Sequence, residues 1–210
     1  MLCSLTVIFL NCNKEVDTQI WNYYTFTDSR DGKTYKYIKI GTQEWMAENL
    51  AFKTASGSWN IWDDETYGAK YGRLYTWEAA KQAVPNGWHL PTDAEWKQLE
   101  MAHGMSQSDA DGIEDRGTNE GYKLKAASGW HDNTDKTTGN GADVVGFNAL
   151  PGGMRTNSGT FFGADWYGYW WSATESDYSK AWMRRLTERS LVFRNLSFKE
   201  DAYSVRCVKD

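Results

Sequence analysis

The chain has 210 residues, a formal net charge of −5, and ordinary fractions of apolar (40%) and charged (24%) residues. This length favours one domain over two and is sufficient to bury a hydrophobic core. No block of lysine and arginine stands out, which argues against a phosphate-binding surface for nucleic acid and against a polybasic membrane patch. The unusual feature is the aromatic content of 12 Trp, 12 Tyr and 8 Phe, which predicts rings both in the core and on a binding face.

The N-terminus resembles an export signal. Its first ten residues are mostly apolar, and this run is far shorter than the roughly 20 residues that a membrane-spanning helix needs. Residues 9–14 resemble a bacterial lipoprotein signal in which Cys12 is acylated; a short N-terminal strand is the alternative. The sequence thus predicts a lipoprotein-type signal over 1–12, a tether over 13–25, and a single domain over 26–210, attached to the outer membrane by its lipid.

The first predicted elements of the domain are two strands and a helix. Residues 34–40 are rich in aromatic and β-branched residues, and a Gly-Thr turn leads into a second strand over 43–46. These two strands are expected to pair as a hairpin. Residues 75–84 have one apolar face at helical spacing and stop at Pro85. A short strand over 88–90 follows.

The next helix has the strongest local signal in the chain. Thr92 is a good N-cap, and Glu95 three residues later completes a capping box. Gly104 is a suitable C-terminal stop. The residues expected to face the core are Trp96, Leu99 and either Ala102 or His103.

The second half of the chain is richer in glycine. Residues 105–146 are polar and acidic, so long loops are expected there, with a short helix near 121–127. Four strands are then expected, near residues 169–172, 181–186, 190–194 and 204–208. Two helices followed by antiparallel strands predict an α+β fold. The tryptophans expected in its core are Trp45, Trp77, Trp88, Trp96 and Trp171.

Several stretches, in their usual order, resemble the Fibrobacter succinogenes major paralogous domain, a family of secreted and surface bacterial modules. These stretches are residues 40–50, 71–80 with 87–96, 146–155, and 169–174 with 204–210. The segment Leu90-Pro91-Thr92 with Glu95-Trp96 is similar to the Leu-Pro-Thr-x-x-Glu-Trp signature of C-type lectin-like domains of the formylglycine-generating-enzyme type. The resemblance implies a C-type lectin-like fold, with two helices packed on antiparallel sheets and long loops, and a place in the cell envelope. The family has no settled biochemical activity.

The sequence lacks the residues that two activities of related domains require. Formylglycine-generating enzymes need redox-active or copper-binding cysteines, whereas the predicted domain has only Cys207, which we expect to be a buried small hydrophobe. Calcium-dependent sugar binding in C-type lectins uses Glu-Pro-Asn or Gln-Pro-Asp. The prolines here, Pro85, Pro91 and Pro151, stand in other contexts.

No catalytic or metal-binding set is evident. The three histidines, His89, His103 and His131, match no catalytic motif. The pair Asp63-Asp64 could serve glycoside hydrolysis, but such pairs are common on surfaces. We expect neither an enzyme nor a bound cofactor, and a hydrolase or oxidase with an unfamiliar site is the alternative.

An acidic loop offers a weak calcium alternative. Calcium prefers several oxygen ligands from one loop, but the spacing here does not complete an EF-hand, so a solvated loop is the preferred interpretation. The carboxylates concerned are Asp109, Asp111, Glu114 and Asp115.

The C-terminal third is the richest candidate for a ligand-binding face, because flat aromatics and forked hydrogen-bonding groups dominate interface hot spots. The candidate residues are Asp165, Trp166, Tyr167, Asp177, Tyr178, Trp182, Arg184, Arg194 and Asn195, accompanied by Phe161, Phe162 and Tyr169. The sequence therefore predicts a non-catalytic surface module that binds a glycan or a protein. A structural component of the envelope and a diversified receptor of a retroelement system are the alternatives.

Overall fold

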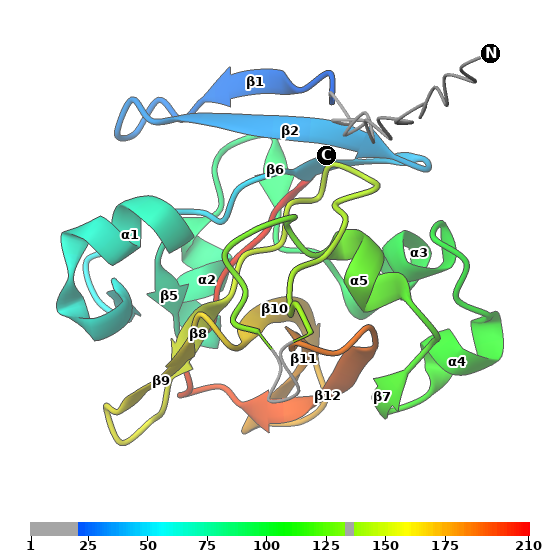
Figure 1. Cartoon of the computed structure of the whole chain (residues 1–210). Helices are drawn as coiled ribbons and strands as arrows, with labels where there is room; N and C mark the ends of the chain where they lie inside the picture. The colour runs from blue at the N-terminus through cyan, green and yellow to red at the C-terminus, as the bar shows by residue number, and fades with distance from the viewer. Residues whose placement is uncertain (1–20, 133–136) are drawn as a thin grey trace, which may run out of the picture.

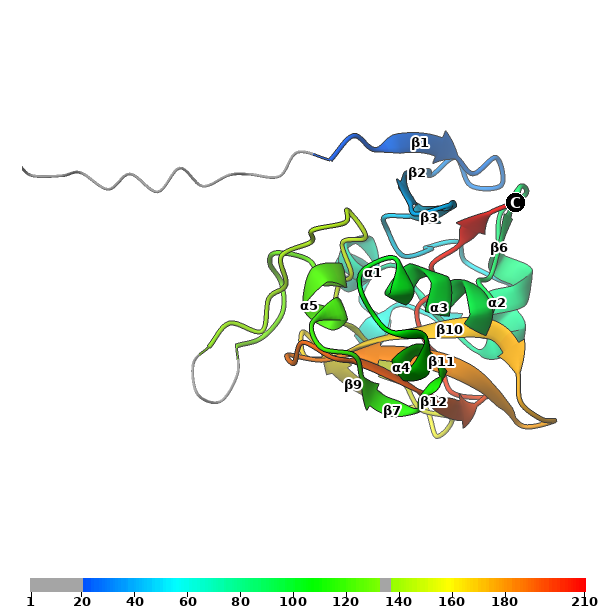
Figure 2. The ribbon, with the colours of Figure 1, turned by 90° about the vertical axis from the view of Figure 1, so that its right-hand side faces the viewer.

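The computed structural model describes residues 21–132 and 137–210, which form two large β-sheets with helices between them and a small two-stranded sheet (Figures 1 and 2). The α+β class predicted from the sequence is thereby confirmed. The predicted signal with Cys12, and residues 13–20 of the predicted tether, lie outside the described residues.

The first sheet has five strands in the order β1-β2-β3-β13-β6. Their bounds are β1 Tyr24–Thr27, β2 Thr34–Ile40, β3 Gln43–Met46, β13 Val208–Lys209 and β6 Trp88–His89. The predicted hairpin is confirmed, since β2 pairs antiparallel with β3. Strand β1 already begins at Tyr24, and Trp21 Nε1 donates to Asp143 O at 2.9 Å. The folded part therefore starts earlier than residue 26.

The second sheet has six strands in the order β7-β12-β11-β10-β8-β9 and forms the opposite layer (Figure 2). Their bounds are β7 Glu114–Arg116, β12 Val192–Phe198, β11 Lys180–Leu186, β10 Gly168–Glu175, β8 Gly152–Arg155 and β9 Phe161–Ala164. The pairs within it are antiparallel except for β8 with β10. Three strands expected from the sequence, near 169–172, 181–186 and 190–194, are thus present and longer than expected.

The remaining elements are mostly short, and α2 and α3 lie between the two sheets (Figure 2). Their bounds are β4 Ser58–Trp59, η1 Ile61–Asp63, α1 Glu65–Tyr71, β5 Leu74–Tyr75, α2 Trp77–Ala83, α3 Asp93–Met101, α4 Gln107–Asp111 and α5 Glu120–Leu124. The predicted helix over 75–84 begins later, because Tyr75 pairs with β4 and Thr76 caps the helix. None of the helices in the described part of the chain is long and apolar enough to cross a membrane.

The C-terminal segment differs from its predicted strand over 204–208. Only Val208 and Lys209 form a regular strand, and Tyr203 and Ser204 make isolated bridges. The chain passes through the middle of the molecule between the two sheets (Figure 1, red). Residues 204–208 are consequently all buried, and side chains on both faces are covered. Cys207 is fully buried, as predicted, and burial raises the pKa of its thiol.

The five tryptophans predicted in the core are all buried. Their indole N–H groups need acceptors there, because an unpaired buried donor costs about 1–3 kcal/mol. Trp77 Nε1 donates to Ser172 O at 2.8 Å and Trp171 Nε1 to Tyr75 O at 2.7 Å. Trp96 Nε1 donates to Trp171 O at 3.2 Å. These bonds tie α2, α3 and β5 to strand β10, so the tryptophans both fill the core and fix its register.

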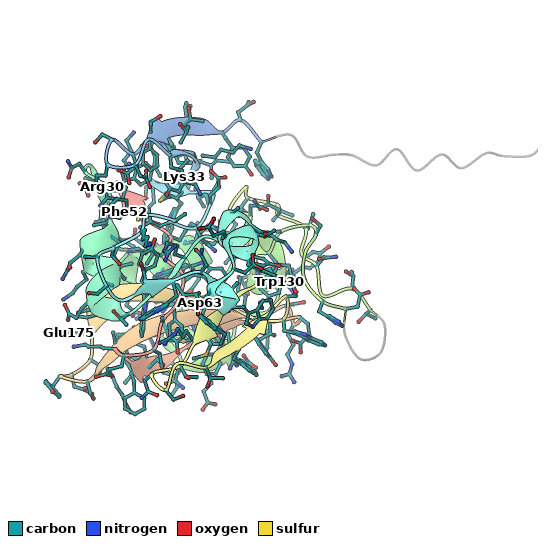
Figure 3. All side chains as sticks on the ribbon, turned by 90° about the vertical axis from the view of Figure 1, so that its left-hand side faces the viewer. Arg30, Lys33, Phe52, Asp63, Trp130 and Glu175 are labelled. Atoms are coloured by element: carbon teal, nitrogen blue, oxygen red, sulfur yellow. The ribbon has the colours of Figure 1, made fainter. Side chains whose placement is uncertain are left out.

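One arginine joins the first sheet to α2 (Figure 3). Arg30 Nη2 donates to the Asp28 carboxylate at 2.6 Å and to Ala83 O at 2.7 Å, and Nη1 donates to Val84 O at 3.1 Å. Its guanidinium lies 3.9 Å from the centre of the Phe52 ring. The last carbonyls of a helix have no partner within it, so Arg30 supplies donors that the end of α2 lacks.

Helix α3 begins with the predicted capping box. Thr92 Oγ1 accepts from Glu95 N at 3.2 Å, and the Glu95 carboxylate accepts from Thr92 N at 2.7 Å. Trp96 and Leu99 face the core as expected. Ala102 does not: it is the C-cap of the helix and is exposed, because the helix ends there.

Replacing Thr92 with alanine is expected to lower the free energy of unfolding by about 1 kcal/mol, because the side-chain half of the box is lost. Urea denaturation followed by tryptophan fluorescence measures this change. Thr92→Ser keeps the hydroxyl and is the matched control, expected to stay within about 0.5 kcal/mol of the wild type. Equal losses in the two variants would contradict the capping account.

His89 links the helix start to the C-terminal segment. Its Nε2 lies 2.8 Å from Glu95 Oε1 and its Nδ1 lies 2.7 Å from Asp210 Oδ1. Burial acts to lower the pKa of His89, but the hydrogen bonds to these two carboxylates outweigh it and raise the pKa above 6.5. Both ring nitrogens can donate only in the charged imidazolium.

The stability of the protein is therefore expected to depend on pH through His89. Because the folded pKa exceeds the unfolded value of 6.5, the contribution is complete below pH 6.5 and is lost as the pH rises through the folded pKa. Urea denaturation between about pH 6 and 8.5 should show this loss, and His89→Gln should remove it. A slope that is the same in both proteins would refute the assignment.

A buried charge network connects α3 to the second sheet. Glu100 accepts from Arg116 at 2.7 and 2.9 Å and from Arg184 Nε at 2.6 Å. Asp93 accepts from Arg184 at 2.8 Å and from Arg194 at 2.7 and 2.9 Å. Burial would raise the pKa of Asp93, but the guanidinium groups of Arg194 and Arg184 hold it well below its usual range. The network thus keeps α3 attached to β7, β11 and β12.

Candidate functional site

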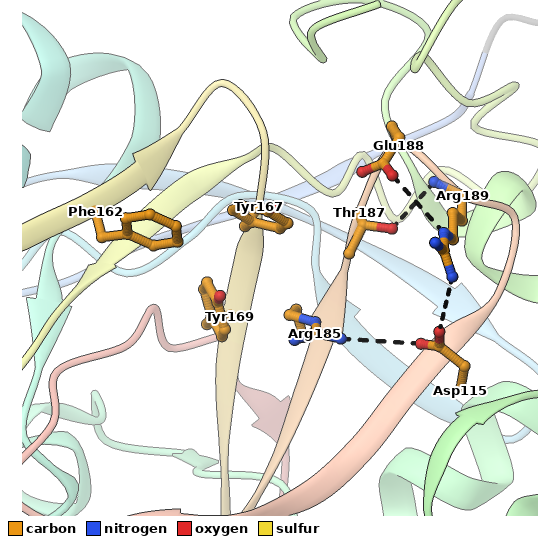
Figure 4. Close-up of a pocket in the computed structure, with 8 residues that line it drawn as sticks. All are labelled: Asp115, Phe162, Tyr167, Tyr169, Arg185, Thr187, Glu188 and Arg189. Carbon is orange, nitrogen blue, oxygen red and sulfur yellow. Dashed lines mark hydrogen bonds and ion pairs between the residues drawn. The ribbon is translucent and has the colours of Figure 1, made fainter. Parts of the chain in front are cut away.

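Two neighbouring cavities share the aromatic pair Phe162 and Tyr167 in their linings. The first has a volume of about 280 Å³ and opens between the start of β10 and the end of β11 (Figure 4). The second has a volume of about 580 Å³ and is lined by Trp62 and the segment 162–167. The structure thus brings together three of the predicted ligand-binding residues, Asp165, Trp166 and Tyr167.

The aromatic wall of the first cavity consists of Phe162, Tyr167 and Tyr169 (Figure 4). The rings of Phe162 and Tyr167 are stacked, with centroids 5.6 Å apart and planes at 16°. Tyr169 continues the wall with its centroid 6.1 Å from that of Tyr167, and burial raises its pKa. A side chain at Gly163 would lie 2.5 Å from the Tyr167 ring, so this glycine makes room for the stack.

The opposite wall of the first cavity is polar and charged (Figure 4). Arg185 Nη2 lies 3.9 Å from the Asp115 carboxylate, and Arg189 Nη1 lies 3.5 Å from it. Arg189 Nε also lies 3.8 Å from Glu188 Oε1. The guanidinium of Arg185 stacks on the Phe193 ring at 3.8 Å. This wall therefore presents two cations and two anions that already face one another.

Lys125 holds this charged wall in place. Its buried ammonium donates to Thr187 O at 2.9 Å, to Glu188 O at 3.0 Å and to Gly139 O at 2.6 Å. Burial lowers the pKa of Lys125 to about 8. Since three carbonyls from two separate segments share one cation, the backbone that carries Glu188 and Arg189 is fixed to the 137–141 loop.

The second cavity carries the exposed part of the aromatic surface. Trp62, Phe162 and Trp166 are 45%, 52% and 36% exposed. His131 stacks on Trp166 with centroids 3.8 Å apart and planes at 14°, and Trp62 packs edge-on against Tyr67 at 4.6 Å. We call Trp62, Phe162, Trp166 and Tyr167 the aromatic face. Large exposed apolar patches are often interaction sites, which makes this face a candidate.

Asp165 lies in the middle of the aromatic face and is firmly held. Its Oδ1 accepts a hydrogen bond from the Tyr71 hydroxyl and lies 3.5 Å from Lys70 Nζ. Its backbone carbonyl accepts from His131 N at 2.7 Å. Burial raises the pKa of Tyr71, and the hydrogen bond to Asp165 raises it further.

The backbone at the aromatic face is strained. Trp62, Asp63 and Asp165 have φ values of 54°, 55° and 68°, in a region that costs a non-glycine residue of order 1–3 kcal/mol. Asp63 lies beside the β8–β9 ribbon, whereas Glu175 lies at the other end of the second sheet (Figure 3). Such residues cluster at functional sites, so the strain points to the same surface as the exposed rings.

Four predicted site residues lie elsewhere and are not part of this face. Arg184 and Arg194 are buried and paired with Asp93 and Glu100, so they do not lie on the exposed face where the prediction put them. Asp177 accepts from Ser179 N and Lys180 N in the β10–β11 turn, and the neighbouring Tyr178 is 97% exposed. This turn and Tyr167 lie at opposite ends of β10, because the turn follows Glu175, the last residue of the strand, and Tyr167 precedes Gly168, its first.

The two remaining predicted residues lie on the central strands of the second sheet. Trp182 in β11 is half-buried beneath the guanidinium of Arg194, which is 3.6 Å from its ring centre. Asn195 in β12 is half-buried and pairs in register with Met183. Neither residue lines the two cavities.

The acidic loop does not gather its carboxylates. Asp111 accepts from Lys97 Nζ at 2.7 Å, while Asp115 faces the two arginines of the first cavity. The Asp109 carboxylate accepts from the hydroxyl of Ser106, the N-cap of α4, and Glu114 is the strand partner of Arg194 in the sheet. Within residues 21–132 and 137–210, no three His, Cys, Asp or Glu side chains are placed to hold a metal.

Several residues of the two cavities are not predicted from the sequence, among them Trp62, Arg185 and Arg189. Trp62 lies a hundred residues before Phe162 in the chain and comes close to it through the packing of η1 against β8 and β9. The sequence does indicate that Arg184 and Arg185 point to opposite faces of their strand, because successive side chains in a strand alternate. Since both faces of β11 are covered, the alternation does not show which of the two arginines faces the cavity.

The chain was compared with known families, curated proteins and solved structures. Residues 38–209 match the model of the Fibrobacter succinogenes major domain (Fib_succ_major). No curated protein and no solved structure matches the chain. The likeness to C-type lectin-like domains therefore stays a prediction. The matched region contains all four residues of the aromatic face. Since it covers most of the 210 residues, the chain belongs to the Fibrobacter succinogenes major domain family.

Proposed function

We propose that this chain is a non-catalytic binding module of the cell envelope, which holds a glycan or protein ligand on its aromatic face. The observation that carries the proposal is the exposure of Trp62, Phe162 and Trp166 around the second cavity, of which Phe162 also lines the first. Large aromatic side chains are the preferred anchors of binding sites, because they offer wide contact area at low entropic cost. The lipoprotein-like start is consistent with a place on the cell surface.

The proposal of binding without catalysis rests on the contacts that the carboxylates of the two cavities make within the protein. Asp165 is engaged by Tyr71 and Lys70, and Asp115 by Arg185 and Arg189. A general acid or base needs a carboxylate within reach of the substrate proton. These carboxylates instead face groups of the protein itself, which suits recognition.

Ligand capture tests the proposal. The purified protein, the Trp166→Ala variant and the Tyr178→Ala variant are applied to a glycan array and used for pull-down from envelope extract. The wild type and Tyr178→Ala are expected to retain the same ligand, and Trp166→Ala is expected to lose it, because Tyr178 lies at the distant β10–β11 turn. Equal capture by all three proteins, or capture by none, would overturn the proposal.

A further inference from the structure

We infer that the two cavities form neighbouring subsites for a neutral oligosaccharide, with one sugar on each side of the Phe162–Tyr167 stack. This inference rests on the proposed function and adds the class of the ligand, its charge and its minimum length. The contacts that carry it are the ion pairs of the charged wall, the shared aromatic pair and the volumes of the two cavities.

The charge of the ligand follows from the ion pairs in the first cavity. Carboxylate and phosphate ligands are bound by guanidinium groups whose donors are free to form paired hydrogen bonds. Here Arg185 and Arg189 both face Asp115, and Arg189 also faces Glu188. The four side chains sum to no net charge. An anionic ligand would have to compete with Asp115, so the cavity favours a neutral one.

A sugar fits the remaining chemistry better than other neutral ligands. Each hydroxyl group both donates and accepts hydrogen bonds, so it can donate to Glu188 and accept from Arg189 without disturbing their pairing. The opposite wall offers the stacked rings of Phe162 and Tyr167 to the flat apolar face of a pyranose. A protein partner would instead bury about 1,200–2,000 Å² in total, a broader contact than one pair of cavities supplies.

The length of the ligand follows from the shared rings. Phe162 and Tyr167 line both cavities, whose volumes are about 280 and 580 Å³. Small-ligand pockets in proteins usually measure about 300–1,000 Å³, so each cavity holds one sugar or a few. A chain that occupies both must pass the Phe162–Tyr167 pair, and its far end then reaches Trp62 and Trp166. The structure therefore favours at least a disaccharide.

Calorimetric titration with defined sugars tests this inference. The probes are glucose, galactose and mannose, their neutral tetrasaccharides, and tetrasaccharides of the corresponding uronic acids. At least one neutral tetrasaccharide is expected to bind about tenfold or more tightly than its monosaccharide and than its uronic counterpart.

Asp115→Asn provides the decisive variant, because it frees Arg185 and Arg189 from their carboxylate partner. It is expected to weaken binding of the neutral tetrasaccharide by about fivefold or more and to strengthen binding of the uronic one. Glu200→Gln removes an exposed carboxylate in the turn after β12 and is the matched control. It should leave both affinities unchanged.

The remaining outcomes separate this inference from the proposed function. The inference would be overturned if the wild type bound uronic tetrasaccharides more tightly than neutral ones. It would also be overturned if none of the sugars bound, while the wild type captured a protein from envelope extract and Trp166→Ala abolished that capture. In both cases the proposed function stands. Sugar binding that Phe162→Ala leaves unchanged would overturn the inference and the proposed function together.

Discussion

Replacing Glu100 with glutamine is expected to lower the free energy of unfolding by about 3–5 kcal/mol, the usual loss when one partner of a buried ion pair is removed. Glu100 is fully buried and accepts hydrogen bonds from both Arg116 and Arg184. The amide keeps the shape of the side chain, but it turns an N–H₂ group towards the guanidinium groups. Arg116 would then lose its carboxylate partner, while Arg184 and Arg194 would keep Asp93.

Urea denaturation measures this loss, and an exposed ion pair supplies its control. Glu78 on α2 lies 3.0 Å from Lys81, and its side chain is 62% exposed. Glu78→Gln is expected to change the stability by less than about 0.5 kcal/mol, as is usual for surface pairs. If Glu100→Gln were as mild as Glu78→Gln, the network would not be what fixes α3 to the second sheet.

Replacing Phe162 with alanine is expected to have the largest effect on ligand binding, because its ring lines both cavities. Its truncation removes one side of the Phe162–Tyr167 stack and opens the two cavities into each other. Truncation of a central aromatic anchor typically costs 2 kcal/mol or more, so the affinity should fall by about thirtyfold or more. Titration with the ligand found by array or pull-down measures it.

A matched control separates binding from folding in this test. Phe198 at the end of β12 is 49% exposed, close to the 52% of Phe162, and lies outside both cavities. Phe198→Ala is expected to keep the affinity of the wild type, and both variants should unfold at similar urea concentrations. An equal loss of affinity in both variants would show that the aromatic face is not the binding surface.

The sequence predicted the elements that are stabilised by neighbouring residues in the chain. The capping box at Thr92 and Glu95, the 34–46 hairpin and the buried tryptophans depend on neighbouring residues and on side-chain size. The short elements α1, α4, β8 and β9 were not predicted. Helices α1 and α4 have local caps at Asp64 and Ser106 but are only 7 and 5 residues long, too short for a clear helical period. Strand β8 depends on its pairing with β10 as well as with β9. The C-terminal run 204–208 looked like an alternating strand, but both of its faces are covered by the two sheets.

The candidate site was predicted only in part, for the same reason. Segment 165–167 is continuous and aromatic, so composition found it. Trp62 and Arg185 reach the cavities from other parts of the chain, and nothing in their local sequence connects them to Phe162. Arg184 and Arg194 carry the residue type of a hot spot, but Asp93 and Glu100 on α3 draw them into the interior.

The central claim, that the aromatic face is the binding surface, is tested most directly by the indole N–H signals of the ¹⁵N-labelled protein in NMR spectra. The neutral tetrasaccharide that binds most tightly in calorimetry is added to saturation. The account predicts that the signals of Trp62 and Trp166 shift, while those of the buried Trp96 and Trp171 stay in place. Unchanged Trp62 and Trp166 signals at saturation would contradict it.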